Sequence, residues 1–275
     1  MAIISELYIY PIKSLAGIKV HRAEVTDRGF KYDRRWMLID DNNRFISQRE
    51  VAAMALLNVS IVDSGLCIST NDSFIIIPFV PGNGDLIAVT IWDDICKAQL
   101  VDEEADKWFS SVLGINCRLV YMPDESLRNT DANYAPEGSI TSFSDGYPFL
   151  LIGQASLDDL NQRLPDPVPM DRFRPNIVFV GSEPYQEDII NEFTIHDINF
   201  RGVKLCARCN ITTINQASGL SGKEPLKTLA GYRAKNKKIY FGQNLVHSGV
   251  GEITVGDEIV IKSIHHEERF LIQKN

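Results

Sequence analysis

The amino-acid sequence predicts a mainly β fold with a few short helices, an α+β arrangement. Short runs of Val, Ile, Tyr and Phe recur along the chain and are separated by Gly, Asn and Asp, which is the pattern of strands joined by turns. Only three segments space their apolar residues as an amphipathic helix does. Apolar residues make up 44% of the 275 residues and charged residues 23%, a composition that excludes a disordered or collagen-like chain.

The first half of the chain is predicted to consist mostly of strands. The expected strands cover residues 3–10, 18–25, 35–40, 57–62, 74–80 and 86–92. The first of them ends before Pro11, because proline cannot donate a hydrogen bond to a sheet. Residues 102–113 are predicted to form a helix, since acidic residues begin the segment, apolar residues follow at helical spacing, and Gly114 is a natural stop.

The second half is predicted to begin with a loop and to continue mainly as strands. Residues 123–148 are rich in Pro, Ser, Asp, Asn and Gly, and a loop of this length is uncommon in a compact domain unless it has a function or links domains. A short helix is expected over residues 156–164, where Ser156 resembles an N-cap. Another is expected from Pro225 to near Tyr232. Further strands are expected within residues 177–181, 193–205 and 252–264.

Charge and hydropathy restrict where the protein works and what it binds. Lys and Arg number 28 against 36 Asp and Glu, a formal net charge of −8, whereas a general nucleic-acid binder usually carries a basic face. No apolar run approaches the roughly 18 to 20 residues that cross a bilayer, and no basic segment precedes the first apolar residues. We therefore expect a cytoplasmic protein with no nucleic-acid and no membrane partner.

Cys206 and Cys209 form a C-x-x-C motif around Arg208. A structural zinc site needs two further Cys or His ligands, and the sequence offers none at finger spacing. A thioredoxin-like redox pair needs a helix after the motif, whereas β-favouring residues follow it here. The third interpretation is a soft-metal thiolate beside an anion grip, because a guanidinium lowers the pKa of a neighbouring thiol and binds phosphate or carboxylate. Cys206 itself is expected to be a partly buried structural thiol, with a persulfide carrier as the alternative.

Several basic residues stand in polar turns of this acidic chain. Lys13 follows the first predicted strand, and Arg34 and Arg174 stand in turns further along. Such residues can build a pocket for an anionic cofactor, although surface solvation explains most single arginines, and spacing alone leaves both interpretations open. His265 and His266 have no further ligand at metal-binding spacing and are expected to lie at the solvated surface.

Seven groups of motifs span nearly the whole chain. They are YPIKS from Tyr10 with Gly17, DRRW from Asp33, SD from Ser144 with PF from Pro148, FRPN from Phe173, CARC from Cys206 with Thr212 and Thr213, KEPL from Lys223, and FGQN from Phe241. In this order they resemble the motifs of MOSC-domain proteins, and the nearest group is the mitochondrial amidoxime-reducing component with its bacterial YcbX-type relatives. The combined set is highly specific, whereas YPIKS or C-x-R-C alone is not.

The resemblance implies a molybdenum cofactor, a pterin dithiolene with a terminal phosphate, and no pyridoxal phosphate. In that family the second cysteine of C-x-R-C ligates molybdenum, which points to Cys209. The positions that match the family's cofactor pocket are Lys13, Ser14, Arg34, Asp145, Gly146, Tyr147, Arg174, Asn176, Arg208 and Asn244. The chemistry is consistent, because a thiolate is a soft ligand for a redox metal and cations neutralise a phosphate whose burial is otherwise costly.

The resemblance also implies two domains, a smaller N-terminal MOSC-associated β domain at residues 1–121 and a MOSC β-barrel domain at residues 122–275. About the first 34 residues are expected to pack with the MOSC domain. The family's Ser-Asp loop often continues with small hydroxyl residues, but here it continues with Gly146 and Tyr147. The ring of Tyr147 is therefore expected to stack on flat substrates.

The implied function is a molybdenum-dependent oxidoreductase that removes oxygen from small N-hydroxylated compounds such as amidoximes and N-hydroxylated bases. Two electrons are expected from a separate flavin or iron–sulfur reductase, because the sequence lacks the further cysteine cluster of some relatives and the membrane anchor of others. Asp145 is expected either to relay protons near the metal or to accept a hydrogen bond from the pterin. The alternative function is a non-catalytic carrier of the cofactor or of sulfur, since a carrier shares every pocket residue.

Overall fold

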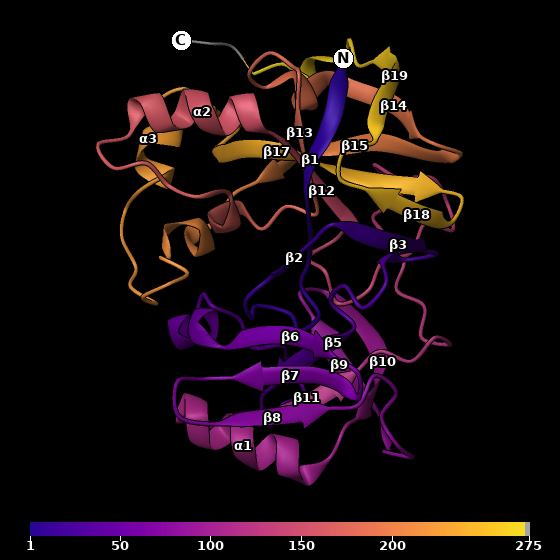
Figure 1. The fold of residues 1–275 in the computed structure, drawn as a ribbon, viewed down its shortest axis with the longest axis vertical. Helices are drawn as coiled ribbons and strands as arrows, with labels where there is room; N and C mark the ends of the chain where they lie inside the picture. The colour runs from indigo at the N-terminus through magenta and orange to yellow at the C-terminus, as the bar shows by residue number, and fades with distance from the viewer. Residues whose placement is uncertain (273–275) are drawn as a thin grey trace.

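Nineteen strands and three α-helices make up most of the regular structure of residues 1–272, the part of the chain that the computed structural model describes (Figure 1). The predicted class, mainly β with a few short helices, is confirmed. The larger unit contains β1 (Ala2–Ile9), β2 (Ile18–Val20), β12 (Phe149–Gly153), β13 (Ile177–Val180), β14 (Ile190–Ile195), β15 (Ile198–Ala207), β16 (Ala234–Lys235), β17 (Lys238–Ser248), β19 (Glu258–Ile264), α2 (Gln154–Arg163) and α3 (Leu226–Ala230). The smaller unit contains β5 (Trp36–Ile39), β6 (Asn58–Val62), β7 (Gly65–Ser69), β8 (Phe74–Ile77), β9 (Leu86–Ile91), β10 (Asp94–Leu100), β11 (Arg118–Tyr121) and α1 (Glu103–Leu113). A short sheet of β18 (Gly251–Thr254), β3 (Arg22–Thr26) and β4 (Gly29–Phe30) lies between them in Figure 1.

Seven strands of the larger unit close into a barrel. Their order is β12, β13, β1, β19, β14, β15 and β17, and pairing of β17 with β12 completes the ring. Only β12 and β13 run parallel within this ring. Strand residues alternate between the two faces, so that the barrel buries one set of large apolar side chains. These include Leu7, Phe149, Phe179, Phe193, Phe200 and Leu245.

The first strand belongs to this barrel although the chain leaves the barrel directly after it. Leu7 pairs with Ile177 of β13, and Ala2 pairs with Ile259 of β19. The chain then runs through the smaller unit from β5 to β11 and returns to β12 along the loop of residues 122–148. Several turns therefore meet where the two units touch.

The smaller unit consists of the sheet β5-β11-β10-β9 and the sheet β6-β7-β8, with α1 alongside (Figure 1). Its apolar core includes the fully buried side chains of Trp36, Leu38, Phe109 and Leu119. Phe109 lies on α1, so this core joins the helix to the sheet strands. Burying each such side chain contributes on the order of 1.5 to 3 kcal/mol relative to leaving it exposed.

The three predicted helices are present, and one begins differently from its prediction. In α1 the Asp102 side chain accepts a hydrogen bond from the Ala105 N–H, and Gly114 ends the helix in the left-handed conformation. In contrast, α2 begins at Gln154 with Gly153 as its N-cap, so the N-cap prediction for Ser156 was wrong. The Ser156 hydroxyl instead donates to the buried carboxylate of Glu187.

The surface prediction for His265 was also wrong. Its side chain is 5% exposed, stacks on Phe270 with ring centroids 3.5 Å apart, and has Nε2 at 2.8 Å from the Gly202 carbonyl oxygen. Burial lowers the pKa of His265, so this imidazole serves packing in its neutral form. His266 is exposed, as expected.

The predicted loop is held in place by a buried side chain rather than by helices or strands. Arg128 donates to the carbonyl oxygens of Ser142 and Ser144, at 3.0 and 2.6 Å, and to the carboxylate of Asp94 on β10. The loop is thereby tied both to itself and to the smaller unit. Among residues 1–272, no helix combines the length and the apolar composition needed to cross a membrane.

Candidate functional site

All eleven residues that the sequence singles out for the cofactor and its metal line one pocket of about 160 Å³. They are Lys13, Ser14, Arg34, Asp145, Gly146, Tyr147, Arg174, Asn176, Arg208, Cys209 and Asn244. Nearly all of them stand just outside strands, in the turns that follow β1 and β15 or precede β5, β12 and β13. The barrel therefore brings together residues that are as far as 231 positions apart in the sequence, from Lys13 to Asn244.

The backbone at three of these positions is left-handed. Ser14, Arg34 and Arg174 have φ angles of 68°, 50° and 55°. Non-glycine residues in this region cost about 1 to 3 kcal/mol each and persist where the surrounding structure holds them. Such strain is concentrated at binding sites, and here it lies in the turns that present basic side chains to the pocket.

Two guanidinium groups that line the pocket pack on one buried phenol, that of Tyr10. The Cζ atoms of Arg34 and Arg174 each lie 4.3 Å from the ring centroid of Tyr10. Arg34 also donates to Asp33 and to Asn176, at 2.6 and 3.0 Å. Burial lowers the pKa of Arg174 to about 10, so the Arg174 guanidinium remains charged at neutral pH. The pair presents two fixed positive charges.

Lys13 and Asp145 form the second charged group of the site. The Lys13 ammonium lies 2.6 Å from one Asp145 oxygen, and Arg49 lies 3.4 Å from the other. Burial lowers the pKa of Lys13 to about 8, although Asp145 acts in the opposite direction. Burial acts to raise the pKa of Asp145, but Lys13 and Arg49 outweigh it and hold that pKa well below its usual range. At neutral pH the carboxylate is charged and Lys13 is mainly protonated.

The two thiols of the C-x-x-C motif differ in their surroundings. Arg208 Nη1 donates to Cys206 Sγ at 3.0 Å, and Arg208 Nη2 donates to the Phe173 carbonyl oxygen at 2.7 Å. Burial raises the pKa of the Cys206 thiol, although Arg208 opposes that shift. Cys209 lines the pocket directly after β15, and within residues 1–272 its sulfur makes no hydrogen bond. Cys209 is thus the thiol available to a ligand in the pocket.

The donor set of the pocket fits an anionic cofactor with a soft metal. Five cations line the pocket, namely Lys13, Arg34, Arg49, Arg174 and Arg208, against the single carboxylate of Asp145. The Nε of Arg208 is buried without a hydrogen-bond partner in the described residues. A buried N–H group normally has an acceptor, so this donor can bind an acceptor on a ligand. No group of three or more potential metal ligands exists in residues 1–272, so the zinc interpretation has no further ligands.

Sequence reasoning missed Arg49, and it placed Asn176 among the cofactor-binding residues without indicating its structural bonds. Arg49 comes from the smaller unit, and no sequence pattern links it to residues near the barrel. The Asn176 side chain is buried, and its amide already bonds Arg34, the Leu150 N–H and the Tyr8 carbonyl oxygen. Asn176 therefore holds the turns that form the pocket.

A larger recess of about 830 Å³ adjoins this pocket. The two share Asp145, Gly146, Tyr147, Cys206, Ala207 and Asn244. The smaller unit contributes Trp92 to its wall, and the 123–148 loop contributes Tyr134. A molecule in the recess therefore lies against the same loop that carries Asp145.

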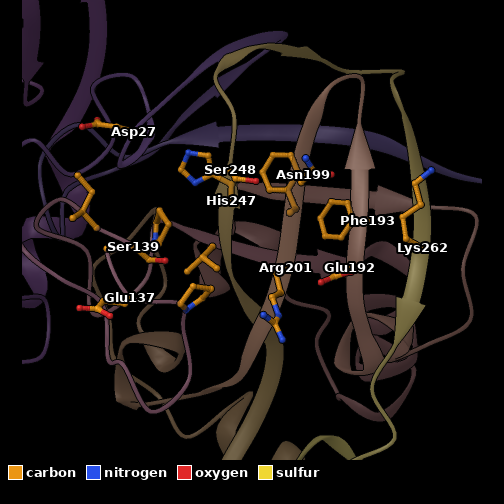
Figure 2. Close-up of a pocket in the computed structure, with 16 residues that line it drawn as sticks. Asp27, Glu137, Ser139, Glu192, Phe193, Asn199, Arg201, His247, Ser248 and Lys262 are labelled. Carbon is orange, nitrogen blue, oxygen red and sulfur yellow. The ribbon is translucent and has the colours of Figure 1, made fainter.

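A third cavity, of about 540 Å³, contains none of the expected residues. Figure 2 shows Glu137 and Ser139 on a loop opposite the strands that carry Phe193 and Arg201. Its charged residues are of both signs, and burial lowers the pKa of His247. The pocket of about 160 Å³ contains both cysteines of the C-x-x-C motif, whereas none of the described residues that line this third cavity is a cysteine.

Comparison with known proteins matches both parts of the chain. Residues 1–116 match the MOSC N-terminal beta barrel domain, and residues 139–260 match the MOSC domain. The mouse mitochondrial amidoxime-reducing component 1 is 34% identical over 94% of this chain and 82% of its own length. The human protein of the same name is 32% identical over the same shares. A rice molybdenum cofactor sulfurase is 30% identical over 90% of this chain, but over only 33% of the rice protein.

Proposed function

Because this chain belongs to the MOSC family, with a MOSC N-terminal barrel domain followed by a MOSC domain, we propose that it is a molybdenum-cofactor-dependent reductase of N-hydroxylated compounds. The observation that carries this proposal is the unbonded Cys209 thiol in a pocket lined by five cations. The names of the relatives at 34% and 32% identity support the reaction class. We also propose that the domains divide at residues 121 and 122, where β11 ends and the loop begins.

The residues divide into a metal ligand and a set that holds the anionic group. Cys209 supplies the thiolate, and Arg34, Arg174, Arg208 and Lys13 supply charge-assisted hydrogen bonds to phosphate and pterin oxygens. Each such bond contributes on the order of 1.5 to 3 kcal/mol. When bound, the cofactor supplies the two-electron chemistry that removes oxygen from an N–O bond.

The direction of the pKa shifts favours Lys13 over Asp145 as the proton-bearing group of the site. A carboxylate whose pKa lies well below its usual range keeps no proton at neutral pH and donates none. Lys13, with a pKa of about 8, holds a proton near neutrality and sits 2.6 Å from Asp145 at the pocket wall. Asp145 therefore orients and charges Lys13, which delivers the proton.

The overall reaction consumes two electrons and two protons, converts the N–OH group to N–H, and releases water. The electrons come from a separate flavin or iron–sulfur protein, and the substrate is a small molecule that enters from the adjoining recess. A carrier that binds the cofactor without turnover is the second candidate, and the match to a molybdenum cofactor sulfurase favours it. The raised pKa of Cys206 opposes a thiolate-based sulfur carrier at that residue.

One experiment separates the two functions. The protein is purified from a host that makes the cofactor, its molybdenum content is measured, and reduced methyl viologen is supplied with benzamidoxime. We expect conversion to benzamidine that scales with molybdenum content. Fully loaded protein that reduces neither benzamidoxime nor an N-hydroxylated purine supports the carrier and overturns the reductase.

A further inference from the structure

Trp92 occupies a turn position that ordinarily favours glycine. It is the first of the two residues that join β9 to β10, and its φ angle is 55°, whereas Asp93 has no positive φ. In a two-residue hairpin whose first turn residue alone has a positive φ, that residue is usually Gly. A bulky residue with a positive φ is an outlier. Such strain is characteristic of ligand clamps and binding sites.

The Trp92 side chain reaches from the smaller unit to the candidate site. Its indole Nε1 lies 3.4 Å from Asp145 Oδ1, and Arg49 Cζ lies 4.5 Å from the ring centroid. The ring of Phe45 packs against it at 61°, with centroids 5.0 Å apart. Arg49 and Asp145 both line the cofactor pocket, and Trp92 lines the adjoining recess. The indole is thus fixed at the junction of the two.

Trp92 also keeps an exposed surface. It is 40% exposed, in contrast to Trp36, which is fully buried. The Tyr147 hydroxyl is buried without a partner, and its ring packs with Val203 and Val246. Tyr147 is nevertheless half-buried and lines both the pocket and the recess, so the stacking role that the sequence suggests for its ring stays a prediction.

We propose that Trp92 is the surface on which a flat, aromatic or heteroaromatic N-hydroxylated substrate stacks, a subsite built by the smaller unit. This inference rests on the proposed reductase function. A ring on the exposed part of the indole lies beside Asp145, and therefore at the mouth of the cofactor pocket. Arg49 positions the indole, because it contacts the ring and pairs with Asp145. Aliphatic N-hydroxylated compounds gain nothing from this surface.

The test compares benzamidoxime with acetamidoxime, which carries the same reacting group without the ring. In oxidised, molybdenum-loaded protein, benzamidoxime quenches tryptophan fluorescence saturably and acetamidoxime does not. Trp92→Gly, which suits the turn, and Trp92→Leu, which keeps apolar packing, both lose this quenching. In the viologen assay they raise the KM for benzamidoxime about tenfold more than the KM for acetamidoxime, because stacking contributes roughly 1.4 kcal/mol to binding of the substrate that carries the ring.

Trp108→Phe, on α1, is the matched control and keeps both the quenching and the KM values. If both Trp92 variants bind benzamidoxime as the unaltered protein does, or if both substrates lose affinity equally, the stacking role is overturned. Failure of the unaltered protein to reduce either substrate rejects the reductase instead, and the fluorescence titration still decides the stacking role.

Discussion

Cys206 and Cys209 lie three residues apart, yet only one sulfur is engaged by the protein. Arg208 donates to Cys206, whereas the Cys209 sulfur faces the pocket without a hydrogen bond in the described residues. We predict that Cys209→Ala purifies with less than a tenth of the molybdenum of the unaltered protein, because no other soft ligand replaces it. Metal analysis of protein from a cofactor-producing host measures this loss.

Cys206→Ala is the control for that measurement. It removes a thiol whose contact is with Arg208, so at least half of the molybdenum is expected to remain. Equal retention of metal by the two variants is incompatible with Cys209 as the ligand.

The pKa of Lys13 makes cofactor uptake depend on pH. Lys13 is protonated at neutral pH and loses its charge above its pKa of about 8. A bound anion raises that pKa, so above about pH 8 binding takes up a proton and weakens as the pH rises, by up to about tenfold per pH unit. We predict that reconstitution of the apo-protein with cofactor weakens between about pH 7 and pH 9, as followed by molybdenum content.

Lys13→Arg provides the matching control, because arginine stays charged over this range. Its uptake is expected to be lower overall and nearly independent of pH. An unchanged pH profile in Lys13→Arg contradicts the assignment of the titration to Lys13.

At the scale of single elements, the N-cap of α1 is recognisable in the sequence and contributes to the stability of the folded protein. The Asp102 carboxylate accepts a hydrogen bond of 2.7 Å from the Ala105 N–H. We predict that Asp102→Ala lowers the free energy of unfolding by about 1 kcal/mol, since it leaves that N–H without its cap. Chemical denaturation measures the change, and Glu104→Ala, at an exposed position of the same helix, is expected to have a much smaller effect. Similar losses in both variants rule out the capping contribution.

A site residue could be predicted from the sequence where a short local motif marks it. A residue that reaches the site only through packing between distant segments could not be predicted. Lys13, Arg174 and Cys209 could be found because each stands in a short motif that resembles a MOSC-family motif, and the structure places all three around one pocket. Arg49 and Trp92 carry no such motif, and they reach the pocket only because the smaller unit folds against the barrel.

The same distinction holds for the strands. The longest strand, β17, was not predicted as one, because Gly242 with a φ of 83° interrupts it and its burial does not alternate. In contrast, most of β15 falls within the predicted strand segment 193–205, although two irregularities in its pairing lie on either side of Lys204 and Leu205. These irregularities lie next to the candidate site, where the strands depart from regular β geometry.

At the scale of the whole molecule, Arg128 connects the two units. Its side chain is 3% exposed, and it bonds Asp94 beside Trp92 as well as the backbone beside Asp145. We predict that Arg128→Ala lowers the free energy of unfolding by about 3 kcal/mol, because it leaves several buried acceptors and one carboxylate without their donor. For a chain of this size, thermal melting shifts by roughly 2 to 4 °C per kcal/mol.

Arg22→Ala removes an arginine from an exposed pair, in which its partner Glu252 lies 3.8 Å away. No measurable change in melting is expected there, because exposed ion pairs contribute little. A melting temperature of Arg128→Ala that matches that of Arg22→Ala is evidence against the connecting role.

The pairing of Ala2 with Ile259 sets the order of events during biosynthesis. The ribosome releases β1 first, but its two barrel neighbours, β13 and β19, emerge only after the whole smaller unit has been made. Until then β1 can pair only with β2, and the barrel cannot close before translation has passed residue 264. Lys13 and Cys209 come together around one pocket only when the barrel closes. Because the pocket takes residues from Lys13 to Asn244, it is complete only when the barrel has closed, and we expect the proposed cofactor to bind after translation rather than to the nascent chain.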